Sequence, residues 1–171
     1  ELCNLKPGKL LLPCEGEGRN AVFAARQKWE VDAFDQSEKG KEKCLALANQ
    51  YKVSVNYKIA DAMEIELEEN KYDMIALIFA HFPSAIRKHF HKKCISALKP
   101  GGLLLLEAFN PLQLNNESGG PGDADMLYTT ALLNDDVRDM NITYLRELKV
   151  NLSEGKHHSG KADVIRLLAT K

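Results

Sequence analysis

Short apolar segments alternate with longer amphipathic segments between residues 9 and 109. One apolar segment, Met74–Ile78, contains no polar residue, as expected of a central parallel strand that is buried on both faces. Alternation of strand-like and helix-like segments is typical of βαβ units. We therefore predict an α/β fold with a Rossmann-like, doubly wound, mostly parallel sheet between two helical layers, a three-layer αβα arrangement.

Apolar periodicity and local stop signals set the predicted boundaries of these elements. Ser37 is a predicted helix N-cap, and Lys99-Pro100-Gly101-Gly102 is predicted to follow the end of a helix. Strands are predicted over Lys9–Pro13, Trp29–Phe34, Val53–Ile59, Tyr72–Phe79 and Leu103–Phe109, and helices over Arg19–Lys28, Glu38–Tyr51 and Pro83–Leu98.

The pattern changes after residue 109. Asn115–Asp123 is rich in Asn, Gly and Pro and is predicted to be a loop, followed by a helix over Ala124–Asp136. Thr143–Leu152 alternates in polarity, and Ala162–Ala169 is a second strand-like segment. Joined by the polar connector 153–160, these two segments predict an antiparallel C-terminal hairpin, which makes the sheet seven-stranded.

Composition indicates one globular domain over residues 1–171. The chain has 171 residues and is 44% hydrophobic, which is enough for a sizeable core. Its 23 Lys and Arg against 24 Asp and Glu give a net charge of −1, without the basic excess of a nucleic-acid-binding protein. The apolar runs are too short to span a bilayer. Four irregularly spaced cysteines match no zinc or redox motif, so we expect reduced thiols and a cytoplasmic location.

The segment Glu15-Gly16-Glu17-Gly18-Arg19-Asn20 joins the first predicted strand to the first helix. Its glycines let a ligand approach the backbone, and Gly16-x-Gly18-x-x-Ala21 fits the dinucleotide fingerprint. Asp35 follows the second strand, 19 positions after Gly16, at a spacing suited to ribose hydroxyls. A tight strand-to-helix turn without a ligand is the alternative. Together, the glycines and Asp35 favour a nucleoside ligand.

Charge favours one nucleoside ligand over another. Glu15 and Glu17 would repel a pyrophosphate but favour the sulfonium and ammonium of S-adenosylmethionine. Asp61 ends the third strand, at the sheet edge where open α/β folds bind ligands. There it could accept a hydrogen bond from an adenine amino group or cap a helix. The loop charge therefore predicts S-adenosylmethionine rather than NAD.

These motifs resemble class I, Rossmann-like S-adenosylmethionine-dependent methyltransferases over nearly the whole chain. The resemblance rests on EGEGRNAVFAA, Asp35, Asp61-Ala62, Tyr72-Asp73, Leu98-Lys99-Pro100-Gly101-Gly102 and the closing hairpin. Gly18-Arg19-Asn20, Gly119-Gly120-Pro121 and Glu154-Gly155-x-His157-x-Ser159-Gly160 resemble the tellurite-resistance/thiopurine-like branch. The family implies the strand order 3-2-1-4-5-7-6.

The resemblance also implies a role for each matching position. The loop would hold the methionine end of the cofactor, the end of the second strand its ribose, and the end of the third strand its adenine. The segment after the fourth strand would lie near the sulfonium and the acceptor. The residues at the methionine end would be Cys14, Glu15, Gly16, Glu17, Gly18 and Asn20, and those at the ribose would be Asp35, Gln36 and Ser37. Asp61 and Ala62 would contact the adenine, and Phe79 and Ala80 would lie near the sulfonium and the acceptor.

The chain departs from the family pattern at two positions of the first strand and loop. Leu12 stands where the family often has an acidic residue, and Cys14 stands where it often has glycine. We hypothesise that Glu15 takes over the acidic role.

Other polar residues give weaker signals. His81 could act as a base or be a polar residue at a helix entry, so no catalytic residue is assigned beyond this weak candidate. His89 and His91 point in different directions on a helix, so with Cys94 they do not predict a metal site. Asp123 and Asp125 could cap a helix or approach substrate.

The resemblance implies in-line displacement at the sulfonium methyl, which gives S-adenosylhomocysteine and a methylated small-molecule acceptor. Two alternatives stay open: an NAD(P)-binding oxidoreductase domain, and a non-catalytic domain that binds an adenosyl ligand. The second is suggested by the short segment before the first strand, because an N-terminal lid often covers the cofactor in this family. The sequence encodes neither the acceptor nor the oligomeric state.

Overall fold

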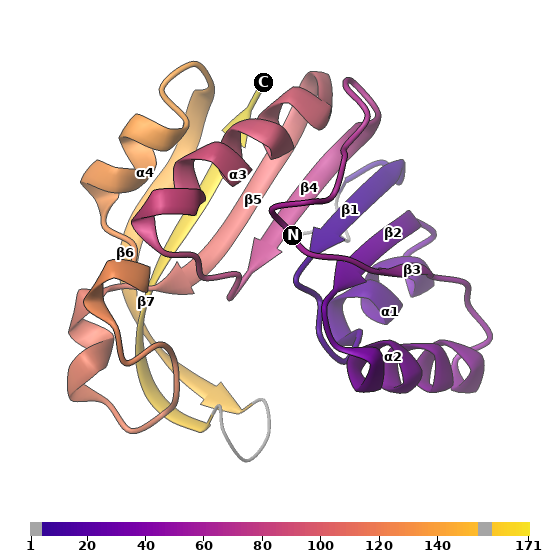
Figure 1. The fold of residues 1–171 in the computed structure, drawn as a ribbon, viewed down its shortest axis with the longest axis horizontal. Coiled ribbons are helices and arrows are strands. Elements are labelled where there is room, and N and C mark those ends of the chain that lie inside the picture. The colour runs from indigo at the N-terminus through magenta and orange to yellow at the C-terminus, as the bar shows by residue number, and fades with distance from the viewer. Residues whose placement is uncertain (1–4, 154–158) are drawn as a thin grey trace.

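A computed structural model describes residues 5–153 and 159–171 as a single seven-stranded sheet with helices packed on it (Figure 1). The strand order is β3-β2-β1-β4-β5-β7-β6. Strands β1 to β5 pair in parallel, and β7 pairs antiparallel with both β5 and β6. The strands are β1 Lys9–Pro13, β2 Glu30–Asp35, β3 Asn56–Ile59, β4 Tyr72–Ile78, β5 Leu98–Phe109, β6 Asn141–Ser153 and β7 Ser159–Thr170. The predicted fold, strand order and terminal hairpin are confirmed.

Two hydrophobic cores lie on opposite faces of this sheet. Leu11 belongs to the core beneath α3 and α4, whereas Leu10 and Leu12 belong to the core beneath α1 and α2. This alternation follows from the two-residue period of a strand. The helices are α1 Arg19–Arg26, α2 Glu38–Gln50, α3 Ser84–Ala97 and α4 Thr130–Asp136. Gly40 N donates to Ser37 Oγ at 3.0 Å, so Ser37 caps α2 as predicted.

Most predicted helix ends lie within two residues of those in the structure, but the last predicted helix is wrong. The helix expected over Ala124–Asp136 is a 3-10 turn over Ala124–Met126 and the separate helix α4. Leu127 and Tyr128 between them are extended and almost fully buried. Their burial against the core outweighs local helix propensity. Strand β5 starts earlier than predicted because Leu98 pairs with Tyr72, and the register shifts before Met74 pairs with Leu103. Residues 154–158, including the motif positions Glu154, Gly155 and His157, lie outside the described residues.

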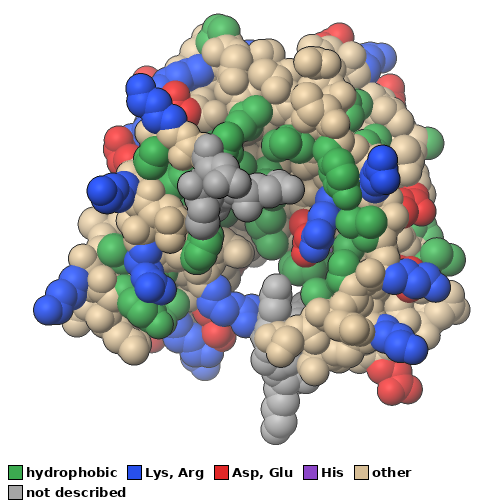
Figure 2. All heavy atoms as spheres, turned by 180° about the vertical axis from the view of Figure 1, so that it is seen from behind, with side chains coloured by type: hydrophobic (Ala, Val, Ile, Leu, Met, Phe, Trp, Pro, Cys, Tyr) green, Lys and Arg blue, Asp and Glu red, His purple; other side chains and the backbone are tan. Residues whose placement is uncertain are grey.

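One face of the sheet carries a broad apolar groove of about 710 Å³. Met74, Leu105 and Leu168 line its floor, between Phe23 of α1 and Tyr144 of β6. Figure 2 shows hydrophobic side chains gathered in this hollow. Within residues 5–153 and 159–171, no helix has both the length and the hydropathy needed to cross a membrane.

Candidate cofactor site

The loop between β1 and α1 is built by two glycines with positive φ. Gly16 has φ +58° and Gly18 has φ +83°, backbone conformations that glycine adopts without steric cost. A Cβ on Gly18 would lie 2.2 Å from Cys44 Sγ of α2, so this glycine allows the loop to pack against the helix. A Cβ on Gly16 would meet no atom within 4 Å. Gly16 therefore presents bare backbone to open space, where a ligand can approach.

Asp35 connects the end of β2 to this loop. Its Oδ2 accepts a hydrogen bond from Gly16 N at 3.2 Å, and its Oδ1 accepts one from Ser37 N at 2.9 Å. A carboxylate offers about four lone-pair positions, so both oxygens keep capacity for ligand hydroxyls. The structure thus brings three predicted site residues into direct contact.

Asp61 lies at the end of the neighbouring β3. Gln36 Nε2 donates to Asp61 Oδ2 at 2.6 Å, and Met63 N donates to Asp61 Oδ1 at 2.7 Å. The Asp61 carboxylate therefore caps the turn after β3 and also contacts a second predicted site residue. Ala62 beside it is buried in the hydrophobic core, and its carbonyl oxygen accepts a hydrogen bond from Lys93 Nζ at 3.3 Å.

Glu15 points beneath α1 instead of into the open space above the loop. Its Oε1 accepts a hydrogen bond from Ala21 N at 2.7 Å, and its Oε2 accepts one from Asn20 Nδ2 at 3.4 Å. Burial raises the pKa of this carboxyl to about 7, although both hydrogen bonds oppose the shift. Glu15 thus fills the N-terminus of α1, where the backbone N–H groups would otherwise be available to an anion.

Glu17, the second acidic residue of the loop, is exposed and forms an ion pair with Lys43. The hydrogen bond from Lys43 lowers the pKa of Glu17. The sequence predicts that both glutamates face the ligand as free charges. In the structure each has a partner of its own, so the exclusion of a pyrophosphate rests on the filled helix N-terminus.

Two residues without glycine's freedom adopt positive φ at the carboxyl ends of the central strands. Cys14, after β1, has φ 54°, and Phe79, after β4, has φ 52°. Burial, Asp35 and Asp61 raise the pKa of the half-buried Cys14 thiol to about 12, so the thiol is neutral. The Phe79 ring lies 4.7 Å from the Phe109 ring, centroid to centroid.

Most of the remaining candidates from the sequence have structural partners. His81 contacts Met126 O and Phe109 N through its two ring nitrogens. His89 is exposed whereas His91 is buried against Asp136, so the two do point in different directions. Asp123 caps the 3-10 turn, and Asp125 accepts from Ser84 N at the start of α3. No three His, Cys, Asp or Glu side chains are grouped to hold a metal ion in the described ranges.

Sequence reasoning did not single out Tyr57 or Gly40, which shape the loop from below. Tyr57 Oη donates to Gly16 O at 2.6 Å. A Cβ on Gly40 would lie 2.6 Å from the same carbonyl oxygen. A glycine inside a helix costs about 1 kcal/mol relative to alanine, so Gly40 carried a signal that the helix packs closely against another backbone. Tyr57 carried none.

Comparisons with known proteins agree with this geometry. A family model described as a methyltransferase domain matches residues 12–102. No curated protein matches the sequence significantly. Among solved structures, TehB from Haemophilus influenzae is 18% identical with a TM-score of 0.79, and the match covers 98% of this chain and 58% of that one. The chain therefore spans less than two thirds of the length of TehB.

Two further solved structures match the fold over most of both chains. An S-adenosylmethionine-dependent methyltransferase from Methanosarcina mazei is 16% identical, with a TM-score of 0.76 and coverage of 98% of this chain and 94% of that one. The 1,6-didemethyltoxoflavin-N1-methyltransferase of Burkholderia thailandensis, with its substrate and S-adenosylhomocysteine bound, is 16% identical. Its TM-score is 0.72, with coverage of 97% and 72%. The family model and these structures support the predicted cofactor, S-adenosylmethionine. Because the family model covers more than half of the sequence, this chain belongs to the methyltransferase domain family, and it has the fold of S-adenosylmethionine-dependent methyltransferases.

Proposed function

We propose that this chain transfers a methyl group from S-adenosylmethionine to a small-molecule acceptor. The observation that carries the proposal is the buried carboxyl of Glu15, 2.7 Å from Ala21 N at the N-terminus of α1. A dinucleotide would place its pyrophosphate at this helix N-terminus. Because an internal carboxyl group already fills the position, the loop suits a nucleoside cofactor without phosphate. This argues against an NAD(P)-dependent oxidoreductase.

The residues at the carboxyl edge fit such a cofactor. Asp35 would accept hydrogen bonds from the ribose hydroxyls, with Gln36 and Ser37 beside it. Asp61 would accept from the adenine amino group, and the open backbone at Gly16 would lie along the methionine end. When bound, the cofactor supplies a methyl group activated on a sulfonium.

The acceptor side is bounded by the half-buried ring of Phe79, which packs on the buried ring of Phe109 with centroids 4.7 Å apart. Aromatic faces favour contact with flat, apolar groups, so we propose a small planar acceptor. The 1,6-didemethyltoxoflavin-N1-methyltransferase that shares this fold acts on a small molecule, which supports this class. The likeness to TehB supports the tellurite-resistance/thiopurine-like branch.

The acceptor would have to be nucleophilic already at neutral pH. Both ring nitrogens of His81 are hydrogen-bonded to backbone atoms, so His81 is not free to take a proton from the acceptor. The bound cofactor would supply the activated methyl group, and the acceptor would supply the lone pair that takes it, leaving S-adenosylhomocysteine. The chain contributes alignment and exclusion of water, which supply much of the rate of such displacements. Any acceptor proton is released to solvent.

The cellular setting belongs to the same proposal. The net charge of −1 gives no basis for binding nucleic acid. Cys14, Cys44 and Cys94 are free thiols, as is usual in a reducing compartment. We therefore place the enzyme in the cytoplasm.

Calorimetric titration with S-adenosylmethionine, S-adenosylhomocysteine and NAD tests the cofactor. We expect the two adenosyl ligands to bind and NAD not to bind. Asp35→Asn should weaken adenosyl binding about tenfold, the effect of losing a charge-assisted hydrogen bond. Asp139→Asn is the control, because Asp139 is exposed and distant in sequence from the loop. Tight NAD binding without a response to the adenosyl ligands would overturn the proposal. Adenosyl binding without turnover of any small-molecule acceptor would favour a non-catalytic binding domain.

A further inference from the structure

The partners of His81 determine which of its ring nitrogens carries the proton. Nδ1 lies 2.7 Å from Met126 O, a carbonyl that can only accept. Nε2 lies 3.3 Å from Phe109 N, a backbone group that can only donate. Both contacts are satisfied when Nδ1 is protonated and Nε2 is not. A doubly protonated ring would direct an N–H group at the Phe109 N–H group and lose that contact.

The surroundings of His81 favour the neutral ring. Burial lowers its pKa, and the bond to Met126 opposes this shift. The ring stacks on Phe109, with centroids 5.5 Å apart and an interplanar angle of 12°. The facing titratable group is Tyr128, whose ring lies 5.3 Å away and whose pKa is raised by burial, so it is also neutral.

Three charged side chains on the elements packed around His81 are engaged with other partners. Asp125, next to Met126, accepts a hydrogen bond from Ser84 N at 2.8 Å. Arg87 of α3 pairs with Asp136 of α4 at 2.8 Å. None of these three side chains forms a hydrogen bond or an ion pair with the His81 ring, and burial is the leading influence on its pKa.

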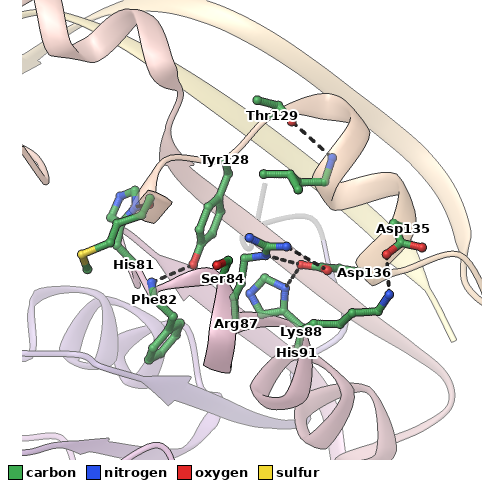
Figure 3. A network of polar contacts seen from close by, with 12 residues as sticks. His81, Phe82, Ser84, Arg87, Lys88, His91, Tyr128, Thr129, Asp135 and Asp136 are labelled. Carbon is green, nitrogen blue, oxygen red and sulfur yellow. Dashed lines mark hydrogen bonds and ion pairs between the residues drawn. The ribbon is translucent and has the colours of Figure 1, made fainter. Parts of the chain in front are cut away.

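Hydrogen bonds of Tyr128 and His81 fasten the segment Asp123–Tyr128 to the segment after β4 (Figure 3). Tyr128 Oη donates to Ala80 O and accepts from Phe82 N, both at 3.0 Å. His81 adds the bond to Met126 O. Because His81 also accepts from Phe109 N at the end of β5, it joins three segments that surround the Phe79–Phe109 ring pair.

We propose that His81 is a positioning residue that holds the acceptor-side ring pair in place as long as its ring is neutral, and that acid releases it. The proposal rests on the proposed function only in naming this surface as the acceptor side. It replaces the idea that His81 is a general base. A base needs a free lone pair directed at substrate, whereas the His81 lone pair is directed at Phe109 N.

Nitrogen-15 NMR of the histidine-labelled protein tests the tautomer without any ligand. We expect His81 to carry its proton on Nδ1 at neutral pH and to titrate below the ordinary histidine pKa of about 6.5. The signals are assigned by comparison with His81→Asn. If that variant does not fold, elimination with the other four of the five histidines replaces it. A proton on Nε2, or a charged ring at neutral pH, would overturn the proposal.

Hydrogen exchange tests whether acid breaks the hydrogen bond from Phe109 N to His81. After correction for intrinsic rates, protection of the Phe109 amide should fall by up to about tenfold per pH unit as the pH drops from the ordinary histidine pKa of about 6.5 toward the lower pKa of folded His81. His81→Asn can still donate to Met126 O but does not titrate, so its protection at Phe109 should be weaker and should lack this acid transition. Parallel profiles in the two proteins would contradict the proposal.

Methyl transfer to 4-nitrothiophenolate tests the link to the acceptor, because this thiolate needs no base and loses its colour when methylated. For His81→Asn we expect the KM of the thiolate to rise about fivefold, the effect of one lost hydrogen bond, with kcat nearly unchanged. A kcat lower by about a hundredfold with unchanged KM, as for loss of a catalytic group, would contradict the positioning role. If the wild type binds the cofactor and shows the Nδ1–H tautomer but does not methylate the thiolate, the proposed acceptor class fails and the assigned tautomer stands.

Discussion

Glu15 is the residue on which the cofactor argument depends most, and its position has an energetic cost. The side chain is only 9% exposed, and burial disfavours its charged form, which raises its pKa to about 7. The hydrogen bonds from Ala21 N and Asn20 Nδ2 offset part of this cost. Near neutral pH the carboxyl group therefore exchanges between an ionised and a protonated state while it fills the N-terminus of α1.

We expect Glu15→Gln to change how stability depends on pH. A carboxyl whose pKa is raised in the folded state from 4.5 to about 7 stabilises the fold most when protonated. The wild type should lose on the order of 3 kcal/mol as the pH rises through this interval. Glutamine fills the same space without ionising, so the variant should lack this loss. Urea unfolding at about pH 5 and about pH 8 measures the difference.

The matched control for this prediction is Glu17→Gln, two positions along the same loop. Glu17 is exposed and its pKa is lowered by Lys43. Its substitution should leave the loss of stability between acid and neutral pH in place. If Glu15→Gln keeps the same pH dependence as the wild type, Glu15 does not ionise in this interval.

At the scale of elements, the loop after β1 and helix α2 can pack closely because glycines stand where they meet. A Cβ on Gly40 would lie 2.6 Å from Gly16 O, and one on Gly18 would lie 2.2 Å from Cys44 Sγ. Asp35 accepts from Ser37 N at the start of α2 and from Gly16 N of the loop, and so fastens the two together. The backbone that would meet the cofactor is therefore positioned by the packing of α2 as well as by the sheet.

Gly40→Ala should weaken both stability and cofactor binding. Helix propensity alone would make this substitution stabilising by about 1 kcal/mol. The contact with Gly16 O should instead make it destabilising by about 2 kcal/mol, a usual cost of overpacking, and should displace the loop. Gly122→Ala is the control, because a Cβ there meets no atom within 4 Å. Unfolding and S-adenosylhomocysteine titration measure both effects, and a stabilised Gly40→Ala would contradict this account.

The elements that the sequence predicts well are those with regular apolar patterns. The run Met74–Ile78 indicates a central strand, and it lies in β4 between β1 and β5. The helix predicted over Ala124–Asp136 is wrong because Leu127 and Tyr128 bury their side chains in extended conformation. That burial depends on segments distant in the sequence, such as Phe82, and local patterns do not contain it.

Part of the candidate site could also be predicted from the sequence, and part could not. Asp35, Gly16 and Ser37 were predicted from spacing, and the structure brings them into contact. The direction in which the Glu15 side chain points was not predictable, because nothing in the sequence shows that it turns beneath α1 to accept from Ala21 N. The same holds for His81, whose partners Met126 and Phe109 are 45 and 28 positions away.

At the scale of the whole molecule, a buried charged cluster joins the two helices that follow the acceptor-side segments. Asp136 of α4 accepts from Arg87 Nε at 2.8 Å and contacts His91 Nδ1 at 2.9 Å (Figure 3). Burial opposes ionisation of Asp136, but hydrogen bonds from His91 and Arg87 outweigh it and keep its pKa below the usual value. Arg87 Nη1 and His91 Nε2 are buried and have no hydrogen-bond partner among the described residues. The cluster therefore depends on Asp136 alone for its negative charge.

Asp136→Asn should destabilise the protein by about 3 to 5 kcal/mol, because it leaves the buried Arg87 without a counter-charge. The lowered pKa also predicts that this stabilisation, present above the ordinary aspartate pKa of about 3.9, is lost in the wild type at more acidic pH. Asp135→Asn is the matched control, since the exposed pair of Asp135 with Lys88 should contribute less than about 1 kcal/mol. Replacing the pair together, Arg87→Met with Asp136→Leu, should restore only part of the lost stability, because an apolar pair needs no compensation but the buried His91 loses its partner. Urea unfolding of the four proteins measures these differences. Equal stability of Asp136→Asn and Asp135→Asn would show that the cluster does not hold α3 and α4 together.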